Sequence, residues 1–164
     1  MTTPPLIRTE QPQDAQAVDA LVERAFGPGR YAKAAERLRE GNRARADLSF
    51  TAWAGETLVG SVRLWPIRVG AAPVIFLGPI AVDPAFRSQG LGQTLVERAC
   101  DAARAAGFRA VLLVGDAPWF DRAGFSAEPT RRIEMPGPVD PRRVLARELV
   151  DGGAADLEGR ATAA

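Results

Sequence analysis

The chain has 164 residues, of which 46% are hydrophobic and 25% are charged, and its formal net charge is +1. This length fits one globular domain, and so small a net charge provides no overall field that would hold a nucleic acid or an anionic membrane. With no histidine and one cysteine, Cys100, the chain cannot form an intramolecular disulfide, a Cys/His zinc cluster or a histidine-based catalytic triad. We therefore expect no metal site and no nucleic-acid partner.

The first ten residues lack the charged and then apolar pattern of a signal peptide. No apolar run in the sequence approaches the roughly 18 residues that a membrane span requires. We therefore expect a cytoplasmic protein that has no membrane partner.

The N-terminal part of the sequence predicts a short strand followed by two helices. The strand covers Leu6 to Thr9, and Pro12 fits the first turn of a helix, where its missing N–H costs nothing. Apolar residues recur at helical spacing from Val18 to Phe26 and give that helix one buried face. Arg30 to Arg45 is helical by propensity but mostly polar, so we expect a surface helix or a mobile flap.

The middle of the chain changes to strand-like runs. Ser49 to Ala54 and Thr57 to Val69 are typical of a hairpin, and Val74 to Val82 is an almost continuous apolar run that indicates a strand covered on both faces. Pro79 interrupts this run. Because proline lacks the N–H that a neighbouring strand would need, Pro79 predicts a bulge or a local parting of the strands.

The clearest helix in the sequence is Gly90 to Ala106, which Gly107 closes. Arg109 to Gly115 predicts a buried strand, so Val74 to Gly115 should form a strand-helix-strand unit with parallel strands and a right-handed crossover. The C-terminal segments predict a short helix at Pro118 to Ala123 and strands at Phe125 to Met135 and Arg142 to Val150.

Together these elements predict an α+β fold. Its mixed sheet should have an antiparallel N-terminal meander and a central parallel strand pair, flanked by helices. We expect residues 1–150 to form this one domain. Residues 151–164 are rich in glycine and alanine and contain one large apolar residue, Leu157, so we expect a disordered tail.

Residues 82–92, Val-Asp-Pro-Ala-Phe-Arg-Ser-Gln-Gly-Leu-Gly, lie between a predicted buried strand and a helix start. Gly90 and Gly92 let the backbone approach a ligand closely, and Arg87 adds a positive charge. The helix start also directs unpaired N–H groups and the positive end of its dipole toward that ligand. These features predict a site for an anion, and a pyrophosphate would suit it.

The pattern Arg-x-x-Gly-x-Gly at residues 87–92, after a strand that ends in Val-Asp-Pro, resembles the acyl-CoA pyrophosphate loop of the GNAT superfamily of N-acetyltransferases. The order of elements over about residues 5–150 is similar to that family, and so is Gly124-Phe125 after the predicted fourth helix. The resemblance implies acetyl-CoA as cosubstrate. It also implies direct transfer of the acetyl group to a primary amine of a small molecule or peptide.

The resemblance also implies which residues bind the cofactor. The backbone of the loop would hold the pyrophosphate, and the end of the preceding strand would pair with the pantetheine arm, where Pro79 already predicts an opening. A backbone N–H near Val82 would polarise the thioester carbonyl. The implied cofactor-binding residues are Ile80, Ala81, Val82, Arg87, Ser88, Gln89, Gly90, Leu91 and Gly92.

Two other interpretations of this loop stay open. Its glycines would also permit tight packing between strand and helix, with the arginine solvated. A dinucleotide-binding fold is the second, because Asp116 lies at the end of the next strand, where a ribose-binding acid belongs. Against it, Leu95 stands at the third glycine position, and seven residues separate Val82 from Gly90.

The sequence does not identify the catalytic residues. An amine with a lysine-like pKa of about 10.4 must lose a proton before it attacks, and the candidate carboxylates are Asp116, Asp121 and Glu128. The family often has a tyrosine four residues before its Gly-Phe pair, which protonates the departing thiolate, but this chain has Phe120 there, and its one tyrosine is Tyr31. A non-catalytic acyl-CoA-binding module is therefore the alternative to an enzyme, and homodimerisation, common in the family, is left open.

Overall fold

The computed structural model describes residues 3–26 and 33–164. The first elements are β1 (Leu6–Thr9), a 3-10 turn at Pro12–Asp14, α1 (Ala15–Phe26), α2 (Lys33–Arg39) and a 3-10 turn at Ala46–Leu48. The central elements are β2 (Phe50–Ala54), β3 (Thr57–Val69), β4 (Ala72–Val82), the 3-10 helix η3 (Pro84–Gln89) and α3 (Leu91–Ala105). The last are β5 (Ala110–Val114), α4 (Ala117–Asp121), η4 (Glu128–Thr130), β6 (Ile133–Glu134), η5 (Pro141–Arg143), β7 (Val144–Glu148) and β8 (Gly159–Ala163).

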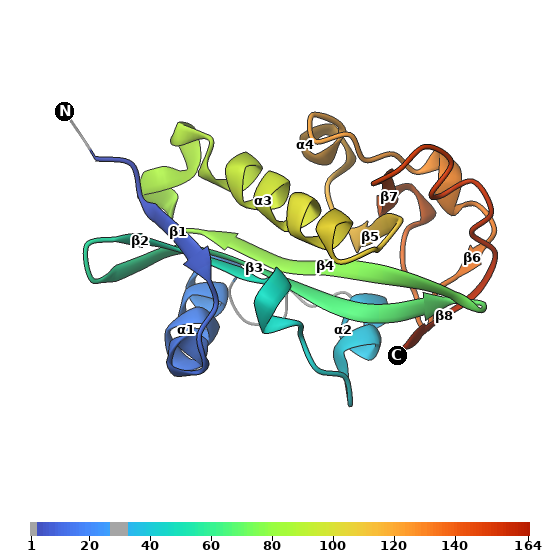
Figure 1. Cartoon of the computed structure of the whole chain (residues 1–164), viewed down its shortest axis with the longest axis horizontal. Helices are drawn as coiled ribbons and strands as arrows, with labels where there is room; N and C mark the ends of the chain where they lie inside the picture. Colours follow the sequence, from blue (N-terminus) through green and yellow to red (C-terminus); the bar gives the residue numbers. More distant parts are fainter. Residues whose placement is uncertain (1–2, 27–32) are drawn as a thin grey trace.

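One mixed sheet runs through the molecule, with the strand order β1-β2-β3-β4-β5-β7 and with β8 beside β3. Strands β1 to β4 form an antiparallel meander, β4 and β5 are parallel, and β7 returns antiparallel to β5. Helix α3 lies on one face of the sheet, and α1 and α2 lie on the other (Figure 1). The predicted α+β fold with an antiparallel meander and a central parallel pair is confirmed.

Each face of the sheet has its own apolar core. On one face, α3 buries a continuous stripe against β3, β4 and β5, made of Leu91, Leu95, Val96, Ala99, Cys100 and Ala103. On the other face, α1 packs Val18 and Leu21 on the N-terminal part of the sheet. Ala35 and Leu38 of α2 pack with Phe76 of β4 in a third cluster. The helices therefore fix the ends of β4 and β5 from both sides.

Helix α2 lies within residues 30–45, where a surface helix or a mobile flap is expected. Among the described residues the helix covers Lys33–Arg39, so it ends before Arg45, and its apolar stripe docks on the sheet, because Ala34 and Leu38 have no exposed surface. Ala34, Ala35 and Leu38 lie on one face, and these three apolar side chains suffice to dock a short helix whose other faces are charged. Tyr31 lies outside the described residues.

Strands β4 and β5 part near the middle of the molecule. They pair at Ile75–Val111 and Phe76–Leu112, while β4 stays hydrogen-bonded to β3 as far as Gly60–Val82. Gly78, just before Pro79, has a φ of 146°, which side-chain-bearing residues rarely adopt, and the β3–β4 register shifts nearby. The parting that Pro79 predicts is confirmed, and it leaves one edge of the last residues of β4 without a strand partner.

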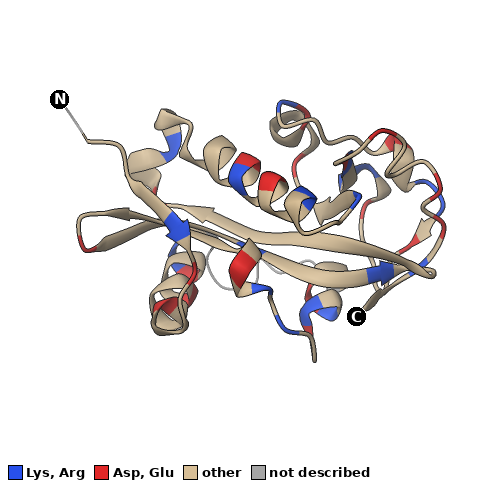
Figure 2. Ribbon diagram, in the orientation of Figure 1, with Lys and Arg blue, Asp and Glu red and all other residues tan. Residues whose placement is uncertain are grey.

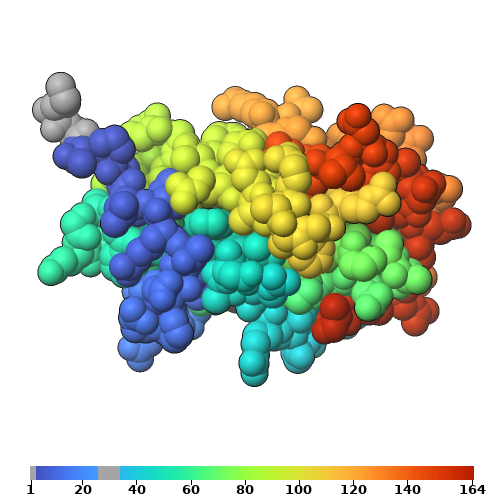
Figure 3. Space-filling model, in the orientation of Figure 1, coloured from blue at the N-terminus to red at the C-terminus, as the bar shows by residue number. Residues whose placement is uncertain are grey.

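The C-terminal segment is ordered, so the prediction of a disordered tail at residues 151–164 is wrong. Strand β8 pairs antiparallel with the end of β3, and Ala154, Leu157 and Ala161 are buried. Figure 3 shows the C-terminal residues, in red, packed into the surface rather than projecting from it. Although β8 has small side chains, it stays on the sheet because its backbone pairs with the end of β3 and Ala161 makes apolar contact there.

The predicted strand over Phe125 to Met135 is also wrong. Most of it is irregular, with the 3-10 helix η4 at Glu128–Thr130, one bridge between Ser126 and Ala146, and the two-residue strand β6. Pro129 lies in the first turn of η4, where its missing N–H is tolerated, whereas inside a strand it would remove a ladder bond.

Charged residues of both signs are interspersed over the molecule (Figure 2). Within the described part of the chain, no helix is long and apolar enough to cross a membrane. The same residues contain no group of three or more Cys, Asp and Glu side chains placed to hold a metal ion. The cytoplasmic location stays a prediction.

Candidate active site

A cavity of about 710 Å³ opens where β4 and β5 part. Its long wall is β4 from Phe76 to Val82, and the opposite wall is the end of β5 with Gly115 and Asp116. Helices α1 and α2 line it on one side, and η3, α3 and α4 line it on the other. Because α1 and α2 cover the opposite sheet face from α3 (Figure 1), the cavity reaches both faces of the sheet.

The loop between β4 and α3 is held by its own backbone and by two side chains. The N–H of Asp83 donates to the Val59 carbonyl of β3, and the Asp83 carboxylate accepts from the Ala85 N–H at 3.0 Å. Arg87 Nε donates to the Val82 carbonyl at 3.2 Å, so its stem folds back along the loop. Asp83 is therefore a turn residue, as its place before a proline indicates, and Arg87 is anchored beside the end of β4.

Gly90 is the residue that turns the loop into α3. It has a φ of 76°, no side chain caps the helix start, and no atom lies within 4 Å of the position that a β-carbon would take. Its backbone is therefore approachable from solvent, and the first N–H groups of α3 lack a side-chain acceptor. Such a helix start attracts an anion.

The nine predicted cofactor-binding residues gather at this end of the cavity. Ile80, Ala81, Val82, Arg87 and Gly92 line it. Ser88, Gln89 and Gly90 are exposed on the loop beside it. The Leu91 side chain is 5% exposed and packs into the core under α3, so only its backbone faces the loop. Their contact with a cofactor stays a prediction.

Helix α4 supplies two aromatic walls. The Trp119 ring packs against Gly92, where a β-carbon would lie 2.9 Å from Trp119 Cζ2. Phe120 is 7% exposed, lines the cavity, and makes edge-to-face contacts with Trp119 and Phe125 at centroid distances of 4.7 and 5.7 Å. Gly92 therefore permits close packing of α3 on α4, whereas the tight-packing interpretation expects the close contact between strand and helix.

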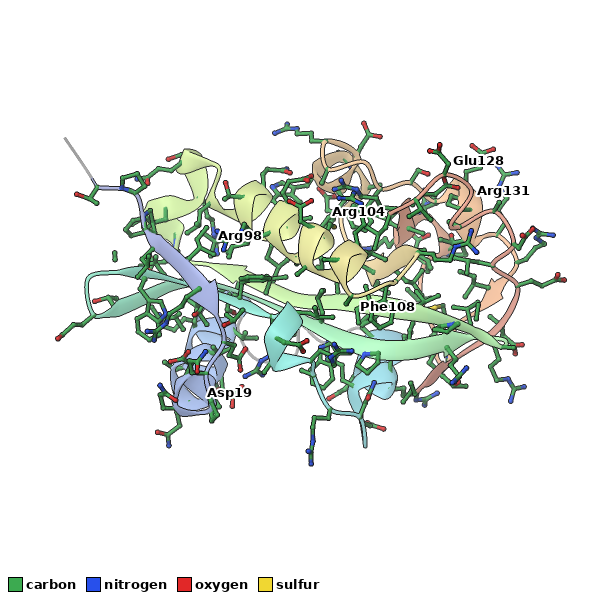
Figure 4. The ribbon with its side chains drawn as sticks, in the orientation of Figure 1. Asp19, Arg98, Arg104, Phe108, Glu128 and Arg131 are labelled. Carbon is green, nitrogen blue, oxygen red and sulfur yellow. The ribbon has the colours of Figure 1, made fainter. Side chains whose placement is uncertain are left out.

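The ionisable groups considered from the sequence differ in whether they line the cavity. Asp116 lines the cavity, at the point where β5 meets α4. Asp121 is exposed outside it, and Glu128 points outward from η4 (Figure 4). Cys100 is fully buried on the core-facing side of α3, and burial raises the pKa of its thiol to about 11, so it is not a nucleophile. Of these groups, only Asp116 is placed to reach a substrate in the cavity.

Sequence reasoning missed two arginines that line the cavity. Arg39, at the end of α2, brings Nη1 to 3.6 Å from the position of a β-carbon at Gly78. Arg143 precedes β7, and its Nε donates to the Gly115 carbonyl at 3.3 Å. Each belongs to a charged stretch of sequence, and the packing of α2 and η5 against the sheet places these two arginines, and not their charged neighbours, at the cavity.

Comparison with known proteins decides the family. The model of the acetyltransferase (GNAT) family matches residues 15–125, from the start of α1 to the Gly-Phe pair after α4. The chain belongs to the GNAT family. This confirms the resemblance drawn from residues 87–92, and it removes the dinucleotide-binding alternative. The protein is thus an acetyltransferase by family.

Individual GNAT proteins match most of the chain. The uncharacterised N-acetyltransferase YhbS of Escherichia coli K12 is 35% identical over 136 residues, which cover 80% of this chain and 81% of YhbS. The structure of Escherichia coli YhbS in complex with CoA aligns with a TM-score of 0.83 at 28% identity, over 100% of this chain and 92% of that one. A GNAT acetyltransferase from Brucella melitensis in complex with acetyl-CoA aligns with a TM-score of 0.62 at 29% identity, over 87% and 94%.

Proposed function

We propose that this GNAT protein transfers the acetyl group of acetyl-CoA to a primary amine by direct attack of the amine on the thioester. The observation that carries the proposal is the cavity at the parting of β4 and β5, which reaches both faces of the sheet. It lies beside residues 87–92, which we call the glycine loop. The complexes of its relatives with CoA and acetyl-CoA support acetyl-CoA as the cosubstrate.

The glycine loop would hold the pyrophosphate of acetyl-CoA. Arg87 supplies a fixed positive charge, and the backbone from Arg87 to Gly92 supplies N–H groups at the start of α3. The open space beside Gly90 fits this role, because a phosphate must approach the backbone more closely than a side chain would allow.

The free edge of β4 would hold the pantetheine arm. Residues Ile80 to Val82 are hydrogen-bonded to β3 on one side, and β5 does not pair with them on the other. An amide-bearing chain can add to such an edge as a strand would, with main-chain hydrogen bonds. The same edge would present an N–H to the thioester carbonyl and stabilise the negative charge that develops on its oxygen.

The reaction would then need only alignment and proton transfer. The amine nitrogen forms the new N–C bond while the C–S bond breaks, and the proton of the amine passes to a base. Asp116 is the candidate base, because it is the carboxylate that lines the cavity among the described residues. The departing thiolate, with a cysteine-like pKa of about 8.5, takes its proton from water near neutral pH, so Phe120 at the usual tyrosine position slows the reaction without preventing it.

A non-catalytic acyl-CoA-binding module is the second candidate, and Phe120 is the observation that favours it. Titration calorimetry with acetyl-CoA and mass-spectrometric screening of amine pools for acetylated products separate the two. Binding together with acetylated product supports the enzyme. Binding without product from any pool supports the module, and absence of binding contradicts both.

A further inference from the structure

We infer that the acceptor amine carries an anionic group, a carboxylate or a phosphate, which Arg39 and Arg143 bind at the two walls of the cavity. This inference rests on the proposed acetyl transfer and adds the class of the acceptor. It is carried by the position of the two arginines in the cavity and by the balance of charge around them.

Arg39 reaches the cavity from the side opposite to the glycine loop. It ends α2, which lies on the other face of the sheet from α3 (Figure 1), and its guanidinium lies over Gly78 at the β4 wall. Because Gly78 has no side chain, the guanidinium can approach the opening between the strands. A group bound there faces the thioester from the acceptor side, whereas Arg87 serves the pyrophosphate on the cofactor side.

Arg143 holds a corresponding position at the β5 wall. The Gly115 N–H donates to the Arg143 carbonyl at 2.9 Å, and Arg143 Nε donates to the Gly115 carbonyl, so backbone and side chain are both fixed to the end of β5. Since β4 and β5 are neighbours and part just before Gly78 and Gly115, the two arginines flank one opening. The bond uses the Nε donor of Arg143, and the two Nη groups of the guanidinium are further donors for a ligand.

The charge of the cavity suits an anion better than a simple amine. Among the described residues, its lining includes Arg39, Arg87 and Arg143 and one carboxylate, that of Asp116. A plain ammonium ion would be repelled there, whereas a carboxylate or phosphate on the same molecule would pair with the guanidinium groups in bidentate fashion. The same positive charges favour the neutral form of a nearby amine, which is the form that attacks.

The first experiment compares matched acceptors. Wild-type protein and acetyl-CoA are incubated with a pool of free amino acids and with the pool of their primary amides, and likewise with O-phosphoethanolamine and with ethanolamine. We expect kcat/KM for the best anionic acceptor to exceed that of its neutral analogue by about 10-fold or more. Preference for the amino acids or for O-phosphoethanolamine identifies carboxylate or phosphate as the recognised group. Faster acetylation of the neutral analogues overturns the inference and leaves acetyl transfer standing. Acetyl-CoA binding with no acetylation of any amine overturns the proposed function and the inference with it.

The second experiment tests the two arginines. Arg39→Gln and Arg143→Gln should each lower kcat/KM for the anionic acceptor by about 10- to 100-fold, mainly through KM, with a smaller effect on the neutral analogue and unchanged acetyl-CoA affinity. Arg39→Lys keeps the charge but loses the planar guanidinium, so its kcat/KM for the anionic acceptor should lie between those of wild type and Arg39→Gln. The controls Arg43→Gln and Arg142→Gln change exposed arginines outside the cavity and should behave as wild type.

Thermal unfolding of each variant checks that it is folded. If Arg39→Gln fails to fold, Arg39→Lys and Arg143→Gln carry the test. Equal loss of rate toward anionic and neutral acceptors, or a loss of acetyl-CoA affinity that matches the loss of rate, overturns the inference, since either result would assign the arginines to folding or to the cofactor.

Discussion

The indole ring of Trp119 lies against Gly92 in the first turn of α3, and a β-carbon at Gly92 would stand 2.9 Å from Trp119 Cζ2. The contact joins α4 to α3 beside the cavity, and Gln93 Nε2 donates to the Trp119 carbonyl in the same place. Trp119 and Gly92 both line the cavity. The Trp119 ring is therefore part of the cavity wall beside the start of α3.

Gly92→Ala should displace the Trp119 ring and weaken acetyl-CoA binding without unfolding the protein. The ring is partly exposed and can move. The higher helix propensity of alanine than of glycine offsets the cost of moving the ring by about 1 kcal/mol. Tryptophan fluorescence and titration calorimetry measure the two effects. In a Trp119→Ala background the same substitution should cost no further affinity. Equal losses in both backgrounds would show that the ring does not mediate the effect.

Gly90→Leu should weaken acetyl-CoA binding far more than Gly107→Leu, although the two changes carry similar backbone strain. Gly90 and Gly107 flank α3, have φ of 76° and 94°, and have no atom within 4 Å of a β-carbon. Each substitution should therefore lower the free energy of unfolding by about 1–2 kcal/mol. Only the side chain at Gly90 would fill the space beside the helix start. Chemical denaturation and calorimetry measure both variants, and undiminished binding by Gly90→Leu would place the pyrophosphate elsewhere.

The local patterns of the sequence predicted the sheet well. Both Leu6–Thr9 and Thr57–Val69 form strands with the predicted bounds, because alternation and turn glycines are properties of neighbouring residues. The last strand could not be found that way. Ala161 is buried because it pairs with Val69, more than half the chain away, and nothing in a Gly/Ala-rich segment indicates such a partner.

The candidate site, too, could be predicted from the sequence only in part. The loop around Gly90 was predictable, since its glycines and arginine are adjacent in sequence and resemble a family pattern. Arg39 and Arg143 were not, because their role depends on how α2 and η5 pack against Gly78 and Gly115. Arginines that line a cavity and arginines in solvent have the same local sequence signature.

Leu157→Ala should destabilise the protein by about 2–5 kcal/mol, as expected for a buried leucine. Leu157 is 4% exposed and belongs to the cluster that contains Ile67, Val69 and Ala161. The neighbouring Asp156→Ala, at an exposed position, is the control and should change the free energy of unfolding by less than about 0.5 kcal/mol. Urea denaturation compares the two. Equal stability of both variants would show that residues 151–164 contribute little to the free energy of unfolding.

Cys100 should resist thiol reagents in the native protein. It has no exposed surface, and burial raises the pKa of its thiol to about 11, so thiolate is a minor form at pH 8. Because the folded pKa is raised, the thiol contributes stability below its unfolded pKa, and that contribution is lost as the pH rises toward 11. Labelling with iodoacetamide, followed by mass spectrometry, should be slow at pH 8 and fast after denaturation in urea. Rapid native labelling would reveal an opening of α3.

Phe120→Tyr should raise the rate of the chemical step. Phe120 lines the cavity from α4 and is 7% exposed, so a hydroxyl on this ring would enter the cavity if the ring edge faces it. Positioned there it would donate a proton to the departing thiolate. General acid catalysis typically contributes about 10²–10⁴-fold, but we expect the low end or less, because a thiolate with a pKa of about 8.5 needs little help.

The measurement is the single-turnover rate of both forms with an acceptor found in the amine screen. Phe125→Tyr is the matched control: Phe125 touches Phe120 but lies outside the cavity lining and is 1% exposed. Its added hydroxyl would be buried without reaching the sulfur, so Phe125→Tyr should lose stability and gain no rate. A Phe120→Tyr variant that binds acetyl-CoA normally and shows no gain would mean that this ring does not face the sulfur or that another group already acts as the acid.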